Sequence, residues 1–305
     1  MELRGPARRP ARGRLRDLRR PGRPAPAGLP GVQHGCDVGR RLRALHRRAE
    51  AGPRGRPRGS QRLKALILAA GRGRRLGERE LPKCLHEVGG RSLLARMLAA
   101  LEPLVDEAIL VVGFAEDELR AAAEAISPSP PLCFVSNPRY TDGSILSLLC
   151  GAERFGEDDL VIMDADVLFP RALLARLIQE APADSFLLDP RSEAGGEEMM
   201  LVAREGRVRR IARRVQPEPG DVVGEGVGFL KLTPASQAVL KGELERLAEA
   251  GEVGRDYEDA IDAALAQLEV GYAEVGDLPW TEIDFAEDLA KAREELLPQV
   301  EALDA

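Results

Sequence analysis

A glycine-rich and arginine-rich loop is the part of the sequence best suited to bind phosphates. It reads Leu68-Ala-Ala-Gly-Arg-Gly-Arg-Arg-Leu-Gly77, follows a short apolar run, and is itself followed by Leu81-Pro-Lys83. Glycines let backbone N–H groups approach a phosphate closely, and arginine and lysine side chains neutralise its charge. The loop lacks the Gly-Lys-Ser/Thr end of a P-loop, and Leu76 stands where the dinucleotide fingerprint requires its third glycine. The segment therefore predicts a phosphate-binding loop of another kind.

Two acidic motifs supply carboxylates that could hold a divalent cation. Asp164 and Asp166 follow an apolar run, and the carboxyl end of a buried strand is where α/β proteins bind ligands. Glu282 and Asp284, in Trp280-Thr-Glu-Ile-Asp284, share one face if that segment is extended. Carboxylates on one face repel each other, so a cation is a natural reason to keep them together, and Mg2+ accepts one or two carboxylates plus substrate phosphates. The alternative is a solvated acidic turn in which Asp284 caps the helix that follows.

The loop and the Pro-Lys pair together resemble the signature of the nucleotidyltransferases that act on sugar phosphates and alcohol phosphates, L-A-A-G-x-G-x-R-L…P-K. In that family the loop wraps the triphosphate of a nucleotide, and the arginine and the lysine neutralise it. The resemblance implies that Arg75 and Lys83 are the catalytic residues. It also places Asp166 among the ligands of Mg2+, beside Glu282 and Asp284. The residues implied here to bind the nucleotide are Leu68, Ala69, Ala70, Gly71, Arg72, Gly73 and Asp164.

A narrower resemblance, over residues 63–297, is to the small cytidylyltransferases that act on phosphocholine, aminoethylphosphonate and similar head groups. The residues that carry it are Asn137-Pro138, Tyr140-Thr-Asp-Gly-Ser-Ile-Leu-Ser-Leu148, Gly224-Glu-Gly-Val-Gly228, Tyr257-Glu258 and Trp280-Thr-Glu-Ile-Asp284. Ser144 and Ser147 are then implied contacts of the pyrimidine, although they are equally suited to be a helix cap and a buried hydroxyl. Those relatives commonly carry Asn where this chain has Asp142 or Gly143, so the loop departs from their pattern beside the base.

Aromatic and acidic residues in the same motifs are candidates for binding the acceptor. A quaternary ammonium is usually held by aromatic faces, and the chain's Tyr140, Tyr257 and Trp280 could form such a cage or belong to the core. A primary amine would favour carboxylates, of which Glu225, Asp256 and Glu258 are available. The predicted acceptor-binding residues are Tyr140, Glu225, Tyr257 and Trp280.

Strands and helices alternate along residues 63–180, which is the pattern of βαβ units with a parallel sheet. Strands are predicted at 64–70, 108–112, 132–135 and 160–163, and helices at 92–104, 116–126, 144–155 and 170–180. Further along, the pattern predicts strands at 186–188, 199–203, 208–215, 226–232 and 270–275, and helices at 234–250, 257–268 and 285–297. The expected fold class is α/β, a Rossmann-like three-layer α/β/α arrangement with a mostly parallel sheet. The resemblance narrows this to the GT-A-like nucleotidyltransferase fold.

The composition changes abruptly near residue 63. Residues 1–62 hold 18 Arg, no Lys and four acidic residues, together with 10 Gly and 8 Pro, so they have little to bury. We expect a disordered Arg/Pro/Gly-rich extension at 1–62, a catalytic domain at 63–297 and a C-terminal tail at 298–305. The extension is open to three interpretations: an arm for RNA or a membrane surface, a transit peptide, or an inert segment.

The remaining composition excludes several other classes of protein. The 305 residues contain no apolar run near the ~18 residues that a membrane helix needs, so no membrane insertion is expected. The four cysteines form no CxxC pair and the three histidines lack metal-ligand spacing, which argues against a disulfide framework and a zinc site. A reduced, cytoplasmic location is the expectation.

The function that these motifs predict is metal-dependent transfer of CMP from CTP to a small phosphorylated alcohol or phosphonate of the phosphocholine kind, with release of pyrophosphate. The acceptor oxygen would attack the α-phosphorus in line, and an anionic acceptor needs no strong general base. The expected cofactor is Mg2+, and the expected partners are CTP or another NTP and the acceptor. No stable nucleic-acid partner is expected, and a homodimer stays open. The alternatives are a sugar-1-phosphate or inositol-phosphate nucleotidyltransferase and, from another class, an inactive nucleotide-sensing or RNA-binding protein.

Overall fold

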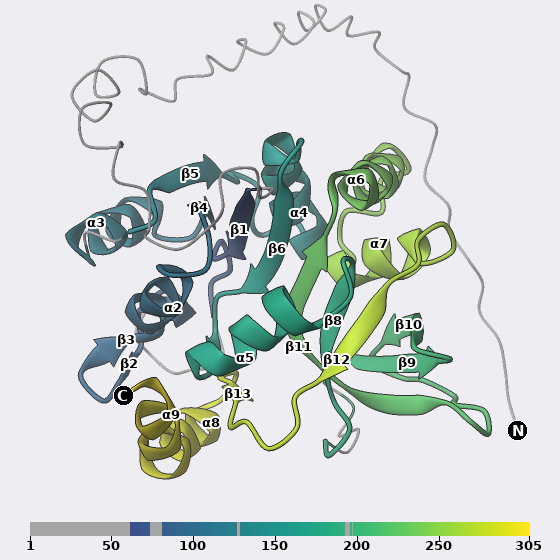
Figure 1. Ribbon diagram of the computed structural model, residues 1–305. Helices are drawn as coiled ribbons and strands as arrows, with labels where there is room; N and C mark the ends of the chain where they lie inside the picture. Colours follow the sequence, from purple (N-terminus) through teal and green to yellow (C-terminus); the bar gives the residue numbers. More distant parts are fainter. Residues whose placement is uncertain (1–61, 74–80, 127–128, 193–195, 197) are drawn as a thin grey trace, which may run out of the picture. The chain divides into compact units, whose positions relative to one another are not determined.

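Four parallel strands form the first half of the central sheet (Figure 1). The computed structural model describes residues 62–73, 81–126, 129–192, 196 and 198–305. The four strands, in the spatial order β5-β4-β1-β6, are β5 (Leu132–Ser136), β4 (Glu107–Val112), β1 (Leu63–Leu68) and β6 (Asp159–Asp164). Parallel neighbours need crossover connections, and helices supply them here. The carboxyl ends of these strands therefore meet at one edge of the sheet.

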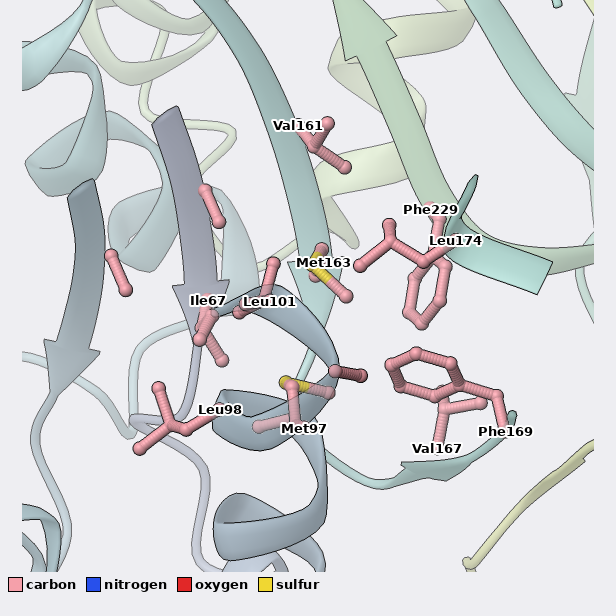
Figure 2. Packing of buried hydrophobic residues seen from close by; sticks show 14 of the residues in the cluster. Ile67, Met97, Leu98, Leu101, Val161, Met163, Val167, Phe169, Leu174 and Phe229 are labelled. Atoms are coloured by element: carbon pink, nitrogen blue, oxygen red, sulfur yellow. The ribbon is translucent and has the colours of Figure 1, made fainter. Parts of the chain in front are cut away.

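Apolar side chains alternate between the two faces of the sheet and form a core on each. In β1, Ala65 and Ile67 point to one face and Leu66 to the other. The first face is covered by α2 (Leu93–Leu101), α3 (Glu116–Ile126) and α5 (Arg171–Ala175), and the second by α4 (Ser144–Gly151), α6 (Pro234–Glu249) and α7 (Tyr257–Ala264). Figure 2 shows the first face, where Met97 and Leu98 of α2 lie over the sheet. This arrangement confirms the predicted three-layer α/β/α fold.

The second half of the sheet is built around one long strand, β11 (Val222–Leu232). It runs antiparallel to β6, β8 (Ser185–Asp189) and β9 (Met200–Arg204). β9 returns into β10 (Arg207–Ala212) through Glu205 and Gly206, which both have positive φ, as a two-residue hairpin turn requires. β12 (Gly271–Glu274) pairs in parallel with β8. The strand predicted at 226–232 thus begins earlier, at Val222, and the one predicted at 208–215 ends earlier, at Ala212.

Two short strand pairs were not predicted from the sequence. β2 (Glu87–Val88) and β3 (Arg91–Ser92) form a small hairpin through Gly89 and Gly90, and Ser92 then caps α2 by accepting from the backbone N of Ala95. β7 (Val167–Leu168) pairs antiparallel with β13 (Thr281–Glu282). The second pair joins the segment just after β6 to a segment near the end of the chain, and it is the pair that assembles the site described below.

The end of the chain is helical where a tail was expected. α8 (Ala286–Lys291) continues through a π-helical turn (Ala292–Leu296) into α9 (Leu297–Asp304). Residues 298–305 were predicted to be a tail, but Val300 of α9 is buried in a third apolar cluster with Ile283 and Leu289. The helix extends into these residues because Leu297 and Val300 lie one turn apart and continue its apolar face.

Of the other predicted helices, α3 has the predicted bounds and the rest are shorter. α2, α4 and α7 each end a few residues before the predicted position, and α4 passes into a 3-10 turn (Ala152–Arg154). α5 likewise ends in a π-helical turn (Arg176–Glu180). The Arg-rich extension predicted at 1–62 falls almost wholly outside the described residues. Within the ranges that are described, no helix is both long and apolar enough to cross a bilayer.

Candidate active site

The glycine-rich loop leaves the carboxyl end of β1 at the centre of the sheet edge. Its first two residues are fixed by backbone hydrogen bonds, from Ala69 N to Val111 O (2.9 Å) and from Phe114 N to Ala70 O (3.0 Å). The next residue, Gly71, is exposed. Gly73 has a φ of 59°, a conformation that favours glycine. The Arg72 guanidinium lies over the ring of Phe114, 5.2 Å from its centroid. Arg75, the predicted catalytic arginine, lies outside the described residues.

Lys83 stands next to this loop on a 3-10 turn (Lys83–Leu85) whose Cys84 side chain is buried in the core. The approach is close, because a Cβ on Gly73 would collide with the side chain of Lys83. The two segments line a cavity of about 220 Å3, here called the loop cavity, together with Gly71, Ala165 and Asp166. The structure thus brings the predicted lysine to the predicted phosphate loop.

Three carboxylates converge beside Lys83. The β7–β13 pair and a hydrogen bond from Ile283 N to Asp166 O (3.0 Å) hold the two acidic motifs together. One oxygen from each of Asp166, Glu282 and Asp284 lies within 4.8 Å of the others. The Lys83 Nζ donates to Asp166 Oδ2 (2.9 Å) and to Asp284 Oδ1. Ile283 lies between Glu282 and Asp284 and is fully buried, as an extended segment with one apolar face requires.

The cluster has the chemistry of a site for a hard divalent cation. All three side chains offer oxygen ligands, which Mg2+ prefers, and an ammonium group already lies between two of them as a stand-in cation. Burial and the neighbouring carboxylates of Asp166, Asp164 and Asp284 raise the pKa of Glu282 to about 9. A divalent cation would reverse that effect by favouring the charged carboxylate. These residues therefore fit the metal that the sequence predicted.

Asp284 does not serve as the helix cap proposed for it. The N-cap position of α8 is Phe285, and the carboxylate that accepts from the backbone is Asp288 Oδ2, bonded to Asp284 N (3.0 Å) and Phe285 N (2.8 Å). The helix begins one residue later than the cap interpretation needs. The Asp284 side chain can therefore point to Lys83 instead.

A cavity of about 400 Å3, here called the main cavity, opens on the other side of Lys83 and is lined by Asp164, Ser144 and Tyr257. The Tyr257 hydroxyl donates to Asp164 Oδ2 and the Tyr257 N donates to Ser144 Oγ, both at 2.8 Å. Burial, Asp166 and Glu258 raise the pKa of Asp164 well above its usual range. Gly228, with a φ of 79°, is needed here because a Cβ would collide with the Asp164 carboxylate. Asp164 thus lines the main cavity and is held in position by its hydrogen bond to Tyr257 of α7.

Ser147 is a buried hydroxyl, one of the two roles left open for it. It is 8% exposed and accepts a hydrogen bond from Asn137 Nδ2 (3.0 Å) within the core. Ser144 lies one turn earlier on α4 and lines the main cavity. Of the two predicted pyrimidine contacts, Ser144 therefore lines the main cavity and Ser147 does not.

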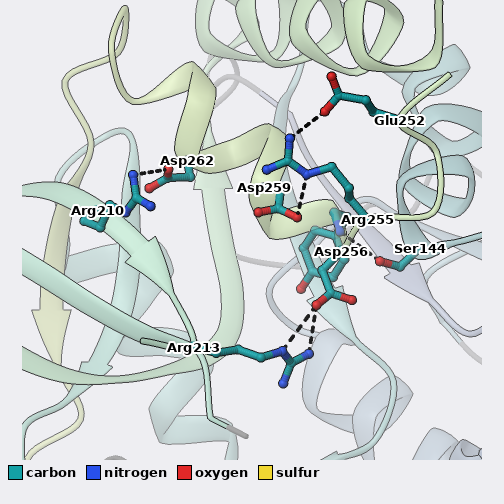
Figure 3. Close-up of polar contacts among 9 residues, drawn as sticks. Ser144, Arg210, Arg213, Glu252, Arg255, Asp256, Asp259 and Asp262 are labelled. Carbon is teal, nitrogen blue, oxygen red and sulfur yellow. Dashed lines mark hydrogen bonds and ion pairs between the residues drawn. The ribbon is translucent and has the colours of Figure 1, made fainter. Parts of the chain in front are cut away.

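Other residues that line the main cavity combine charge with apolar walls. Arg213 Nη2 and Asp256 Oδ2 form an ion pair at 3.0 Å (Figure 3), and Glu258 lines the same cavity. Burial and Asp256 raise the pKa of Glu258 to about 8. The apolar walls are Phe186, Met199, Ile211 and Ile261. Arg213 was missed from the sequence, because nothing local distinguishes it from the neighbouring arginines of residues 207–214.

The predicted acceptor residues are divided between separate places. Glu225 and Trp280 line a further cavity of about 590 Å3, here called the outer cavity, where Trp280 Nε1 donates to Asp189 Oδ2 (2.8 Å). Tyr140 packs edge-on against Phe114, with ring centroids 6.2 Å apart. Tyr257 alone of the three aromatic residues is in the main cavity, so these three described residues do not form one cage. Glu282 and Asp284 line both the main and the outer cavity.

Comparison with known proteins places this geometry in a family. Residues 65–224, just over half of the chain, match the family model of the MobA-like NTP transferase domain. Over 240 residues the chain is 28% identical to a CMP-5'-(3-aminopropyl)phosphonate synthase of Streptomyces rubellomurinus. Over 251 residues it is 31% identical to a bifunctional IPC transferase and DIPP synthase of Rubrobacter xylanophilus. These matches cover 75% and 80% of this chain but 38% and 54% of the relatives, so the chain spans about half of their length or less.

Solved structures share the fold. The inositol-1-phosphate CTP transferase from T. maritima superposes with a TM-score of 0.61 at 20% identity, covering 78% of this chain and 98% of that one. The CTP:phosphocholine cytidylyltransferase from Streptococcus pneumoniae gives 0.60 at 20% identity, covering 76% and 98%. At this level of identity the likeness establishes the fold alone, which is the nucleotidyltransferase fold predicted from the sequence. With the family match, it follows that the chain belongs to the MobA-like NTP transferase family.

Proposed function

We propose that the enzyme transfers CMP from CTP to a small acceptor that carries a phosphate or phosphonate and an amine, with Mg2+ as cofactor. The observation that supports this most directly is the position of Lys83 and the carboxylates of Asp166, Glu282 and Asp284. Lys83 and Asp166 line both the loop cavity and the main cavity, and Glu282 and Asp284 line the main cavity beside them. A triphosphate on the loop and an acceptor in the main cavity would therefore face each other across these groups.

The reaction needs little covalent chemistry from the protein. An acceptor oxygen forms a bond to the α-phosphorus, the bond from that phosphorus to the bridging oxygen breaks, and pyrophosphate leaves with the electron pair. The acceptor oxygen is already anionic, so no strong base is required. Lys83 and the backbone N–H groups of the loop would bind and orient the phosphates, and Mg2+ held by the three carboxylates would neutralise part of their charge. Catalysis is then mainly positioning and charge neutralisation.

The choice of cytosine rests on what the similar proteins are named for: a CMP-phosphonate synthase and two structural neighbours that use CTP. We expect kcat/KM for CTP to exceed that for UTP, dTTP and GTP by about tenfold or more, the effect of one or two specific base contacts. Pyrophosphate release, with the four nucleotides crossed against an acceptor panel, measures this. The panel holds 3-aminopropylphosphonate, phosphocholine, inositol 1-phosphate and glucose 1-phosphate.

Each other outcome of that assay points to a different function. Equal rates with UTP or dTTP and a preference for glucose 1-phosphate would move the enzyme to the sugar-phosphate branch. Nucleotide binding without any pyrophosphate release would support the inactive sensor.

The amine is proposed from the charges in the main cavity. Asp256, Glu258 and Arg213 line this cavity and Arg213 pairs with Asp256, so two carboxylates face one guanidinium in this group. The raised pKa of Glu258 reflects a buried carboxylate without enough positive charge nearby, and a bound ammonium group would supply it. A primary amine suits this better than a quaternary one, because the aromatic residues expected to form a cage are in different places.

Glu258→Gln should therefore raise KM for an amine-bearing acceptor by about tenfold or more, because a charge-assisted hydrogen bond worth roughly 1.5–3 kcal/mol is lost. It should leave KM for CTP and the rate with inositol 1-phosphate nearly unchanged. The matched control is Asp259→Asn, since the next carboxylate along α7 pairs with Arg255 outside the cavity (Figure 3). An equal loss with every acceptor would show that Glu258 supports the fold and does not recognise the amine.

A further inference from the structure

Lys83 occupies the place where a metal ion would have to bind. Its Nζ donates to both Asp166 and Asp284, which supply two of the three oxygens in the carboxylate cluster. An ammonium group and a divalent cation are both positive, and they cannot share the same two carboxylates without strong repulsion. A cation that coordinates Asp166 and Asp284 together therefore requires Lys83 to leave them.

A second set of contacts shows where Lys83 can go. Its carbon stem lies against Gly73, and Lys83 lines the loop cavity together with Gly71, Gly73 and Asp166. Lys83 is also shared with the main cavity, so its side chain stands at the boundary between the phosphate loop and the carboxylates. Rotation about the stem would exchange the carboxylate oxygens for phosphate oxygens while the backbone turn stays in place. Four rotatable bonds in the lysine side chain make such a change easy.

We propose that Lys83 is a placeholder for the metal in the free enzyme and that it makes metal binding depend on the nucleotide. In the free enzyme the ammonium neutralises Asp166 and Asp284 and keeps the cluster closed to divalent cations. When a triphosphate binds at the loop, its charge draws Lys83 away, and the two carboxylates become available. The same side chain thus positions the phosphates and controls access to the metal site. By linkage, nucleotide and metal then bind with positive cooperativity.

This inference takes two assumptions from the proposed function: a triphosphate binds at the loop, and a metal ion binds at the carboxylates. It does not depend on the base or on the acceptor. The test measures binding of Mn2+, a spectroscopic substitute for Mg2+, to the free enzyme by electron paramagnetic resonance. The variants are Lys83→Met, which removes the ammonium, and Lys83→Arg, which keeps a positive charge. The matched control is Lys64→Met, because Lys64 forms an ion pair with Asp158, the residue before β6, at the opposite end of that strand from the cluster.

Lys83→Met should bind Mn2+ at least about tenfold more tightly than the parent when no nucleotide is present. Its melting temperature should rise on adding Mn2+, whereas that of the parent should change little. Lys83→Arg and Lys64→Met should both bind Mn2+ as weakly as the parent. If Lys83→Met does not fold, Lys83→Gln provides the same comparison.

Equal or weaker Mn2+ binding by folded Lys83→Met would overturn the placeholder role and would leave the CTP assay untouched. If CTP is not the preferred nucleotide, the assignment of cytosine is wrong, but the result on Mn2+ binding is unaffected. The two proposals can therefore fail separately.

Discussion

Replacing Lys83 with alanine is expected to lower kcat/KM by about 100- to 1,000-fold, by analogy with the loss of one preorganised transition-state donor, worth roughly 2.7–4 kcal/mol. Burial alone would lower the pKa of Lys83, but Asp166 and Asp284 raise it above its ordinary value, so the group is a permanent positive charge. It is held by a turn whose Cys84 is buried, beside the phosphate loop. Once a bound triphosphate has drawn the ammonium to the loop, the charge is in place before negative charge develops on the phosphates, so the chemical step costs little reorganisation.

The measurement is pyrophosphate release under saturating Mg2+, with circular dichroism to verify that the variant is folded. Tighter metal binding by the free variant, as inferred above, would not rescue the rate, because the ammonium is also missing from the phosphates. Lys64→Ala is the control, since it removes a lysine from an ion pair of similar exposure at the start of β6. Near-parental kcat/KM in Lys83→Ala would mean that the lysine only balances the carboxylates, and the assignment of the loop would have to be abandoned.

The elements that position the site follow from short-range patterns in the sequence. The four parallel strands are apolar runs, and each alternates its side chains between two cores, as Ala65, Leu66 and Ile67 do in β1. A short continuous apolar run, bounded by turn residues and by helical patterns, predicts such a strand and the edge at which it ends. The phosphate loop and Asp166 could therefore be placed at one edge without knowing any contact between distant residues.

It is harder to predict from the sequence which distant segments meet at the site. Glu282 and Asp284 could be assigned to one face of a segment, but what carries them to Asp166 is the two-residue pairing of β7 with β13. A pair of strands this short has no periodicity of its own to detect. It is stabilised by Ile283 and Leu168, which pack with α8 and α9 in the third apolar cluster. Those helices include the very residues that were predicted to be a tail.

The sequence also did not predict which of the candidate acceptor-binding residues lie together. Tyr140, Tyr257 and Trp280 belong to three motifs, and aromatic side chains gain as much from packing as from binding a cation. Tyr140 packs on Phe114, and Trp280 donates to Asp189, a residue on another strand. Asp256 and Glu258 reach the main cavity because α7 begins there, opposite Arg213. Which of these residues meet depends on the packing of α7 against the sheet, which composition and spacing do not specify.

Asp166→Asn and Asp284→Asn should each reduce activity by about 1,000-fold or more at ordinary Mg2+ concentrations, the effect of losing several kcal/mol of charge stabilisation. Each change keeps the size of the side chain and removes one negative charge from the cluster that also contains Glu282. Mg2+ gives up its water reluctantly and is held by few protein ligands, so the loss of one carboxylate cannot be compensated by the others. The residual rate should rise when the Mg2+ concentration is increased, because the defect is in binding the metal.

The folded chain should tolerate both changes. Removal of one carboxylate relieves its repulsion with the others, and it also removes a partner of Lys83, so the two effects on the free energy of unfolding oppose each other. The decisive measurement is therefore a thermal-shift series with CTP and Mg2+ added separately and together, run beside pyrophosphate release. The parent should be stabilised by the pair of ligands more than by the sum of each alone, and both variants should lose that excess. Glu287→Gln, which removes an exposed carboxylate of α8, should behave as the parent does.

If CTP with Mg2+ stabilises both aspartate variants as strongly as the parent, and the parent remains active in EDTA, then Asp166 and Asp284 serve only to hold Lys83. Transfer would then proceed on the charge of that lysine and the loop without a metal ion.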